Sequence, residues 1–275
     1  MNAALVLGGG GVKAAAHVGA WRAVTEAGLT PVHYIGTSMG AVIAAAFAAG
    51  LAPPDIATRM AGVRTDDVAR PRAGAAQLGL GAPSLFDIEP LRGVIEQIVP
   101  VRAFAELTRP LTVTAVDLDT GDLALFGRGG RDIPLIEALL ASCALPFFYP
   151  PVTIGPARYA DGGLRAVLPL EPAAQSGAEV VVAVDTGPGF DEPRGEPGTA
   201  PALVDAHNSA TGILMASNTR AAVALWRATP GLPRLVYVRP RVDRNVTFRV
   251  DLAAKYAEEG YRATREALVM AGRND

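Results

Sequence analysis

The sequence is poor in the residues that build disulfide frameworks and metal centres. Its 275 residues include one cysteine, Cys143, and three histidines, His17, His33 and His207. A single thiol cannot form an intrachain disulfide, and three scattered imidazoles do not favour a metal site. We therefore expect a reducing compartment, no metal and no cofactor.

Charge and long apolar runs are also scarce. Only 19% of the residues are charged and the formal net charge is -2, so no global basic field for nucleic acid is expected. The most apolar stretch, residues 41–49, is far shorter than the roughly 20 residues of a spanning helix. Residues 1–7 lack the charged leader of a signal peptide. These features predict a cytoplasmic protein whose contact with membranes is peripheral and transient.

Hydrophobic residues are abundant, at 50% of the chain, which is enough for a large core in one domain over residues 1–275. Short apolar runs alternate with alanine-rich segments, and this order predicts an α/β fold with a mainly parallel sheet. The expected strands are 3–7, 32–35, 111–117, 123–126, 157–159, 179–185 and 235–238, and the expected helices are 12–28, 41–50, 88–99, 133–143, 202–227 and 252–270.

Two segments break this alternation. From Thr65 to Leu85 the sequence is rich in Gly, Arg, Pro and Ala, and its length is typical of a mobile loop or lid. Residues 187–201 combine Gly, Pro and acidic residues and are expected to form a surface loop. The first segment is a candidate cover for a binding pocket.

Residues 36–40, Gly-Thr-Ser-Met-Gly, have the form G-x-S-x-G between a predicted strand and a predicted helix. A serine on such a sharp turn is held in a strained conformation, and the flanking glycines remove the Cβ atoms that would clash. Its hydroxyl is then exposed at a helix N-terminus, where developing negative charge is favoured. Ser38 is the candidate nucleophile, although a small-residue turn that merely packs tightly has the same pattern.

Residues 8–11 are four consecutive glycines, also between a strand and a helix. Their N–H groups can converge on one point, as an oxyanion hole requires, and Gly9, Gly10 and Gly11 are the candidate donors. The alternative is nucleotide binding: Gly9, Gly11 and Ala14 fit a loose G-x-G-x-x-G/A fingerprint, with Glu26 as the ribose acid. That interpretation leaves Ser38 without a role.

Residues 161–163, Asp-Gly-Gly, follow the predicted strand at 157–159. An aspartate before two glycines can approach another turn closely, although Asp-Gly is also a common plain turn. Parallel sheets gather their sites at the carboxyl ends of strands, where the serine and glycine turns also lie. Asp161 is therefore the candidate base for Ser38.

Taken in order, these motifs resemble the patatin-like phospholipases in their compact bacterial form. Residues 9–14 resemble the family's G-G-G-x-R/K-G motif, 36–40 its nucleophile elbow and 161–163 its D-G-G/A motif, while 141–152 are similar to A-S-x-A-x-P…F-P-P-V. The resemblance covers nearly the whole chain. Ala14 departs from the family's usual glycine, and Ala166-Val167 stands where many relatives carry asparagine.

The resemblance implies a patatin-like three-layer α/β/α sandwich and a Ser38–Asp161 dyad in place of a triad. It implies a lipid acyl hydrolase, of phospholipase, lysophospholipase or carboxylesterase type, that forms an acyl-enzyme on an ester substrate. A non-catalytic lipid-binding scaffold of the same fold is the alternative, and nucleotide binding is a further one.

The histidines and arginines allow further interpretations of the site. His207 follows Asp161 in the Ser…Asp…His order of α/β-hydrolases, but it lies in a predicted long helix and not in a loop. Arginines before and within the loop at Thr65–Leu85 could meet phosphate headgroups, although a solvated basic face is favoured. These are Arg59, Arg64, Arg70 and Arg72.

Overall fold

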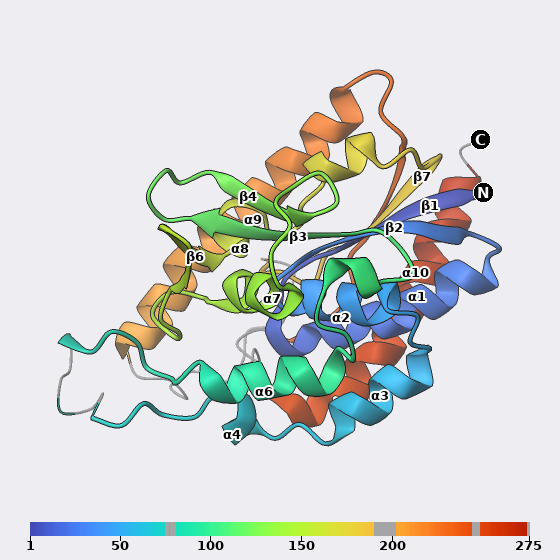
Figure 1. Ribbon diagram of the computed structural model, residues 1–275. Helices are drawn as coiled ribbons and strands as arrows, with labels where there is room; N and C mark the ends of the chain where they lie inside the picture. The colour runs from blue at the N-terminus through green and yellow to red at the C-terminus, as the bar shows by residue number, and fades with distance from the viewer. Residues whose placement is uncertain (75–76, 78–80, 190–201, 244–247, 274–275) are drawn as a thin grey trace.

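A computed structural model describes residues 1–74, 77, 81–189, 202–243 and 248–273 (Figure 1). Its centre is an eight-stranded sheet in the order β5-β6-β3-β2-β1-β7-β8, with β4 paired to β3. The strands are β1 (Asn2–Leu7), β2 (Thr30–Thr37), β3 (Leu111–Asp117), β4 (Leu123–Gly127), β5 (Val152–Ile154), β6 (Ala157–Asp161), β7 (Val180–Val184) and β8 (Arg234–Val238).

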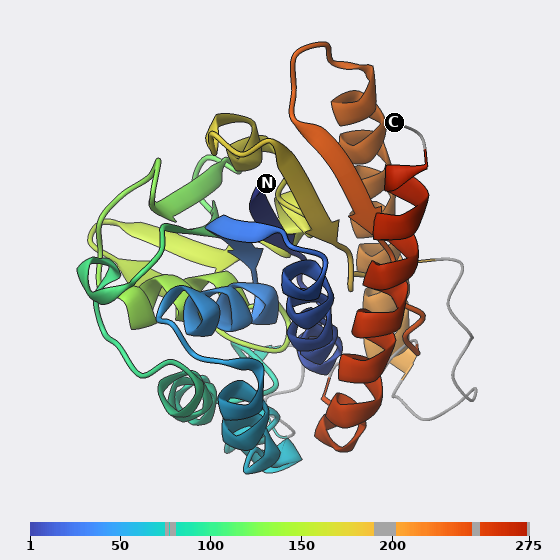
Figure 2. The ribbon, with the colours of Figure 1, turned by 90° about the vertical axis from the view of Figure 1, so that its right-hand side faces the viewer.

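Helices cover both faces of this sheet, as Figures 1 and 2 show. The α-helices are α1 (Ala16–Glu26), α2 (Met39–Ala48), α3 (Pro53–Ala61), α4 (Thr65–Val68), α6 (Glu89–Ile98), α7 (Leu135–Cys143), α8 (Gly163–Ala166), α9 (Ala202–Ala228) and α10 (Ala253–Gly272). Short 3₁₀ turns are η1 (Gly11–Ala15), η3 (Phe104–Glu106), η4 (Glu171–Gln175) and η5 (Val250–Leu252).

Successive side chains of the central strands point alternately into two hydrophobic cores, one on each face of the sheet. In β1, Leu5 and Leu7 join the cluster formed with α1, α2, α6 and α7, while Ala4 and Val6 face the cluster that contains Val223 of α9. Strands buried on both faces need near-continuous apolar sequence, which β1 and β7 have. The predicted three-layer α/β/α sandwich is therefore confirmed.

The sheet is parallel at its centre and antiparallel at one edge. Strands β2-β1-β7-β8 and β2-β3 pair in parallel, whereas β4 and β6 pair antiparallel to β3 and β5 pairs antiparallel to β6. The sequence predicted the parallel majority. It gave no sign of the three-residue strand β5 or of helix α3.

Strands β2 and β6 meet end to end along one edge of β3. Residues 112–116 of β3 pair with β4 on one edge, so β2, which pairs with 111–114, and β6, which pairs with 115–117, both lie on the other. Because β2 runs parallel and β6 antiparallel to β3, their carboxyl ends converge. Thr37 lies opposite Thr114 and Asp161 opposite Ala115, so Ser38 and Asp161 emerge at the same point.

The described residues of the segment from Thr65 to Leu85 contain more regular structure than the mobile loop that the sequence predicts. It begins with helix α4, and the N–H of Arg72 donates to Leu85 O at 2.8 Å beside a bridge between Pro71 and Phe86. The Tyr149 hydroxyl also donates to Val68 O. Residues 75–76 and 78–80 of the predicted lid, and 190–201 of the predicted surface loop, lie outside the described residues.

Within the described ranges, no helix combines the length and the apolar character needed to cross a membrane.

Candidate active site

Ser38 lies at the sharp turn between β2 and α2. Its φ is 55° and its ψ is -137°, a conformation that side-chain-bearing residues rarely adopt and that costs roughly 1–3 kcal/mol. A Cβ on Gly36 would lie 2.5 Å from Ala41 Cα, and one on Gly40 would lie 2.3 Å from Leu7 O. Both flanking glycines are thus required by close backbone contacts.

A second side chain fixes this turn. The backbone N–H of Ser38 donates to Ser142 Oγ at 2.7 Å, and Ser142 is buried near the end of α7. Ser142 lies in the segment 141–152 that resembles the family's A-S-x-A-x-P…F-P-P-V motif, and the sequence predicted no role for it. That resemblance was the only signal for this residue.

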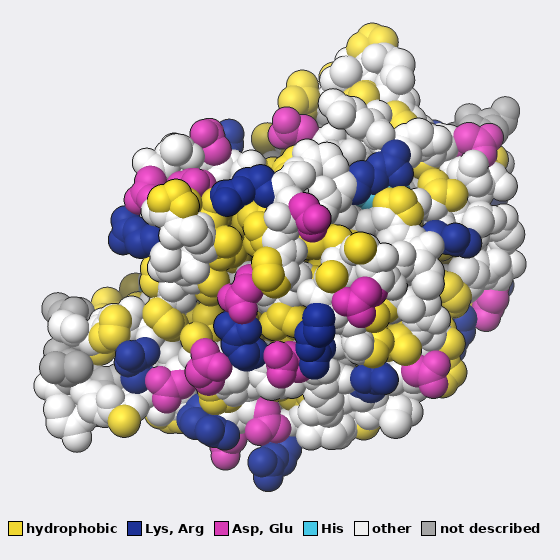
Figure 3. Space-filling view, in the orientation of Figure 1, with side chains coloured by type: hydrophobic (Ala, Val, Ile, Leu, Met, Phe, Trp, Pro, Cys, Tyr) yellow, Lys and Arg dark blue, Asp and Glu magenta, His cyan; other side chains and the backbone are white. Residues whose placement is uncertain are grey.

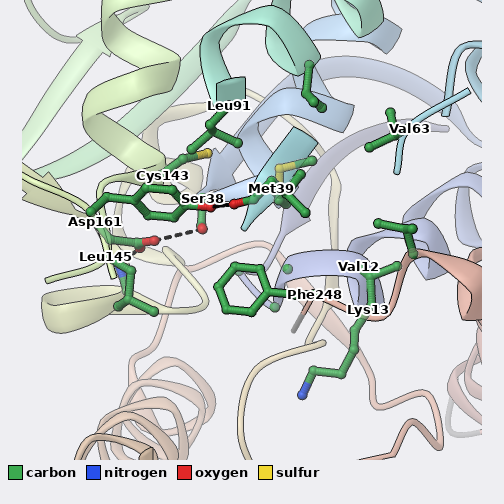
Figure 4. Close-up of a pocket in the computed structure, with 18 of the residues that line it drawn as sticks. Val12, Lys13, Ser38, Met39, Val63, Leu91, Cys143, Leu145, Asp161 and Phe248 are labelled. Carbon is green, nitrogen blue, oxygen red and sulfur yellow. Dashed lines mark hydrogen bonds between the residues drawn. The ribbon is translucent and has the colours of Figure 1, made fainter. Parts of the chain in front are cut away.

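The Ser38 hydroxyl donates to Asp161 Oδ2 at 2.7 Å, as the dashed line in Figure 4 shows. The other carboxylate oxygen, Oδ1, accepts the N–H of Gly163 at 2.7 Å. Asp161 is 4% exposed, and burial raises its pKa to about 6, opposed by the hydrogen bonds from Gly163 and Ser38. A buried carboxylate with this pKa can accept a proton near neutral pH.

The glycine loop lies against the same turn. A Cβ on Gly9 would be 3.2 Å from Ser38 Cβ, so the two turns are in contact. The N–H of Gly9 donates to Val167 O at 3.0 Å. Within the described part of the chain, the N–H groups of Gly10 and Gly11 have no protein acceptor, as is usual at the start of a helix.

These elements open onto an apolar cavity of about 160 Å³ (Figure 4). Ser38, Asp161 and the glycine loop lie on its wall together with apolar side chains from α4, α6, α9 and the segment at Phe248. The apolar contributors include Val68, Leu91, Val94, Ile98, Met215 and Phe248. A cavity with this apolar lining could hold an apolar group, and its walls strengthen polar interactions at Ser38.

None of the three histidines is hydrogen-bonded to Ser38 or Asp161. His17 Nε2 is 2.8 Å from Gly8 O, and His33 Nε2 is 2.9 Å from Thr112 Oγ1. The His207 ring stacks on Phe147 at 4.8 Å between centroids. Burial lowers the pKa of both His17 and His33 to about 4.

The predicted nucleotide fingerprint is not assembled. Glu26, the proposed ribose acid, lies at the last residue of α1 and accepts a hydrogen bond from Tyr261. An 11-residue helix is about 16 Å long, so this carboxylate is far from the glycine loop at the opposite end. Among the residues described, no group of three His, Cys, Asp or Glu side chains could hold a metal ion.

The basic residues near the pocket have partners of their own. Lys13 lies on the pocket wall, but its Nζ is 3.4 Å from Gly187 O and points away from Ser38 in Figure 4. Arg59 donates to Gln97 O, Arg64 pairs with Asp67 and Arg72 with Asp87. Of the four arginines singled out by sequence, including Arg70, none lines the cavity.

The two departures from the family pattern are both compatible with an intact site. Ala14 is buried in η1 and carries no catalytic side chain. Ala166 contributes its carbonyl to Thr37 Oγ1 at 2.9 Å, and Val167 contributes its carbonyl to Gly9 N–H. At both positions, 166 and 167, the backbone makes the contact with the site.

Comparison with known sequences yields a match to the model of the patatin-like phospholipase family over residues 5–174. An uncharacterized NTE family protein of Mycobacterium tuberculosis is 31% identical over 201 residues, covering 68% of this chain and 51% of the relative. Patatin-like phospholipase domain-containing protein 7 of Rattus norvegicus is 32% identical over 187 residues, covering 67% of this chain and 13% of the relative. The chain thus spans about half the length, or less, of these curated relatives.

Among solved structures, VipD from Legionella pneumophila aligns with a TM-score of 0.48 at 14% identity, covering 98% of this chain and 67% of that one. The type III effector protein ExoU aligns with a TM-score of 0.42 at 15% identity, covering 98% of this chain and 53% of that one.

Proposed function

The chain belongs to the patatin-like phospholipase family, and from that premise we propose that it is a lipid acyl hydrolase with Ser38 as nucleophile and Asp161 as general base. The substrate class is an acyl ester of a lipid, cleaved by a phospholipase, lysophospholipase or carboxylesterase reaction. One observation carries the proposal: the 2.7 Å hydrogen bond from Ser38 Oγ to the buried Asp161 carboxylate on the wall of an apolar cavity.

In the acylation step, Ser38 Oγ attacks the ester carbonyl carbon while its proton passes to Asp161 Oδ2. The negative charge develops on the carbonyl oxygen, and the N–H groups of Gly10 and Gly11 stabilise it. We assign these two donors because the Gly9 N–H already donates a hydrogen bond to Val167 O. The role of Gly9 is then to let the glycine loop approach Ser38 closely. The alcohol then leaves with the proton from Asp161, and an acyl-enzyme remains.

In the deacylation step, water gives a proton to Asp161 and attacks the acyl carbonyl carbon. Ser38 leaves and regains its proton from Asp161, and the fatty acid departs. A pKa of about 6 makes the carboxylate a better base than an ordinary aspartate while keeping it mostly ionised at neutral pH. No imidazole and no cofactor are needed for these steps.

The exposed face of α9 supports a transient contact with a membrane surface. Met215 of α9 lines the cavity, and its neighbours Ile213 and Leu214 are 53% and 65% exposed. From residue 206 to residue 219 this helix carries no charged side chain. Apolar side chains exposed beside the cavity would lower the free-energy cost of moving a lipid from a membrane to Ser38.

We propose no nucleic-acid partner, because the formal net charge of the chain is -2. Acidic and basic side chains are intermixed on the face drawn in Figure 3, and no extended basic stripe crosses it. We also propose that residues 1–275 act as one patatin-like domain, since strands from both ends of the chain share one sheet. A cytoplasmic location remains part of this proposal.

The test is covalent labelling with an alkyl fluorophosphonate, followed by hydrolysis of a medium-chain nitrophenyl ester. We expect labelling at Ser38 and turnover, both lost in Ser38→Ala, with circular dichroism unchanged. A matched control is Ser176→Ala, which removes a serine hydroxyl away from the cavity and should keep both labelling and turnover. Turnover by pure Ser38→Ala protein would refute the nucleophile, whereas a folded wild type that is neither labelled nor active would favour the lipid-binding scaffold.

A further inference from the structure

Two buried side chains hold the carbonyl groups of the glycine loop. His17 Nε2 lies 2.8 Å from Gly8 O. The Thr186 hydroxyl lies 3.1 Å from Gly8 O and 3.3 Å from Gly9 O, so its proton can serve either carbonyl. Both side chains are fully buried, and neither belongs to the dyad.

Fixing these carbonyls also fixes the N–H groups that follow them. A peptide unit is planar and trans, so the C=O of one residue and the N–H of the next point in opposite directions. Gly8 O faces His17, and Gly9 N–H accordingly points the other way, toward Val167 O at 3.0 Å. Gly9 O faces Thr186, so Gly10 N–H is directed away from Thr186.

The direction away from Thr186 is the direction of the catalytic cavity. Gly10 lines that cavity together with Ser38, whereas Thr186 is fully buried behind the loop. A Cβ on Gly10 would lie 2.4 Å from Thr186 O, so the loop rests directly on this residue. Glycine at position 10 is therefore required by the contact with Thr186.

We propose that Thr186, assisted by His17, is a positioning residue that aims the amide of Gly10 at the oxyanion of the reaction. The inference rests on the proposed function and goes beyond it, because neither residue touches the reacting atoms. A preorganised donor costs no reorganisation at the moment of reaction, which is the source of its catalytic value.

The segment that carries Thr186 is itself held firmly. Asp185 Oδ1 accepts the N–H of Gly187 at 2.9 Å, and Asp185 Oδ2 accepts the Tyr237 hydroxyl at 2.7 Å. Arg239 donates to the carbonyls of Asp185 and Gly187 at 3.2 and 2.8 Å. Thr186 is thus presented by a turn that is anchored on both sides, as a positioning residue must be.

His17 is suited to a role that does not change with pH. Its Nε2 carries the proton, because a carbonyl oxygen can only accept, and its Nδ1 is buried without a partner in the described chain. Burial lowers the pKa of His17 to about 4, so the ring stays neutral wherever Asp161 is ionised. The loop should therefore keep one geometry across the working range of the enzyme.

The experiment compares Thr186→Val, which removes the hydroxyl at nearly constant shape, with Thr186→Ser, which keeps it. On a soluble nitrophenyl ester we expect the valine variant to lose about tenfold or more in kcat, with KM within about twofold and the acid midpoint of the pH profile unchanged. The serine variant should recover most of the rate. An alkyl trifluoromethyl ketone, which forms an oxyanion on Ser38, should bind the valine variant more weakly by a similar factor.

Wild-type kcat and inhibitor affinity in Thr186→Val would overturn the inference. A lower kcat accompanied by a shifted pH midpoint would also overturn it, because the effect would then act through Asp161. If the valine variant did not fold, Thr186→Ala, which places no methyl beside the carbonyls, would give the same comparison with Thr186→Ser. Failure of the proposed function itself is distinct: wild-type protein would then show no fluorophosphonate labelling.

Discussion

Asp161 divides its two carboxylate oxygens between a backbone amide and the Ser38 hydroxyl. Oδ1 accepts the N–H of Gly163 and Oδ2 accepts the hydroxyl of Ser38, each at 2.7 Å. The backbone contact fixes the plane of the carboxylate, so the lone pair of Oδ2 stays aimed at Ser38. In the proposed mechanism, this single residue combines two roles that a triad divides between an imidazole and the carboxylate that orients it.

Asp161→Asn should remove the proposed base while keeping the shape of the side chain. We expect kcat to fall by on the order of a thousandfold, because an amide cannot accept the Ser38 proton at neutral pH. The measurement is steady-state hydrolysis of a soluble nitrophenyl ester. Asp117→Asn is a matched control, since Asp117 orders a turn by accepting the N–H of Asp119. A fully active Asp161→Asn variant would require another base.

The rate should depend on pH through the ionisation of Asp161. Because burial raises the pKa of Asp161 to about 6, only the ionised fraction can accept the Ser38 proton. We expect kcat/KM to be level above about pH 7 and to fall roughly tenfold per unit below pH 6. A midpoint near pH 4, the value of an ordinary exposed aspartate, would contradict the buried setting of this carboxylate.

The same pKa shift predicts a cost in stability. A carboxyl whose pKa is raised on folding favours the native state when protonated, so its contribution is present below about pH 4 and is lost as pH rises through about 6. The shift from 3.8 to about 6 corresponds to a pH-dependent change of ~3 kcal/mol. The free energy of unfolding of Asp161→Asn, relative to wild type, should rise by an amount of this order between pH 4 and pH 7 in urea titrations. A pH-independent difference would show that Asp161 is not destabilised by burial.

Much of the fold follows from local sequence patterns. The near-continuous apolar residues of β1 and β7 and the glycines that end α1 and α2 predict the parallel core of the sheet. The turns at Gly10 and Ser38 each follow a parallel strand, so their gathering at one edge of the sheet could also be predicted. Asp161 follows β6, which is antiparallel to β3, so that rule does not place it. The order of the motifs then indicated the family resemblance, which implied the three-layer sandwich.

The rest depends on pairing between distant segments. That β2 and β6 share one edge of β3, which brings Ser38 to Asp161, is set by strand register and has no local signature. Thr186 likewise follows an apolar strand, and nothing in the sequence around it distinguishes it from other small polar residues in that position. Its contact with Gly9 O joins residues 177 positions apart. Such roles arise only when the chain is folded.

A dyad predicts that histidines away from the glycine loop are dispensable. His33 is hydrogen-bonded to Thr112 and His207 stacks on Phe147, so neither reaches Ser38. We expect His33→Gln and His207→Gln each to keep catalysis within about tenfold, a barrier change of roughly 1.4 kcal/mol. Loss of a true triad base would cost on the order of a thousandfold. Such a loss in a folded His207→Gln protein would favour an α/β-hydrolase triad.

Ser142 should affect catalysis through the shape of the elbow. Ser142→Ala leaves the Ser38 N–H without its acceptor, so we expect kcat to fall by about tenfold and stability by about 1–2 kcal/mol. The matched control is Ser176→Ala, which removes an acceptor from the buried N–H of Ala178, away from the cavity. Urea titrations should show similar stability losses, while only Ser142→Ala slows hydrolysis. Equal rates in the two variants would remove Ser142 from the site.

The contact between Tyr149 and Val68 gives a test of the predicted lid. The Tyr149 hydroxyl donates to Val68 O at the end of α4, and both residues line the cavity. This hydrogen bond therefore connects the start of the segment from Thr65 to Leu85 to the wall of the cavity. Tyr149→Phe removes the tie and keeps the ring. If the segment covers the acyl chain, kcat/KM for a long-chain ester should change several-fold more than that for a short soluble ester, because only the long chain would reach Val68.

Tyr261→Phe is the control, since the Tyr261 hydroxyl donates a hydrogen bond to Glu26 at the far end of α1. Equal effects of Tyr149→Phe on both substrates would mean that the segment is only a surface connection.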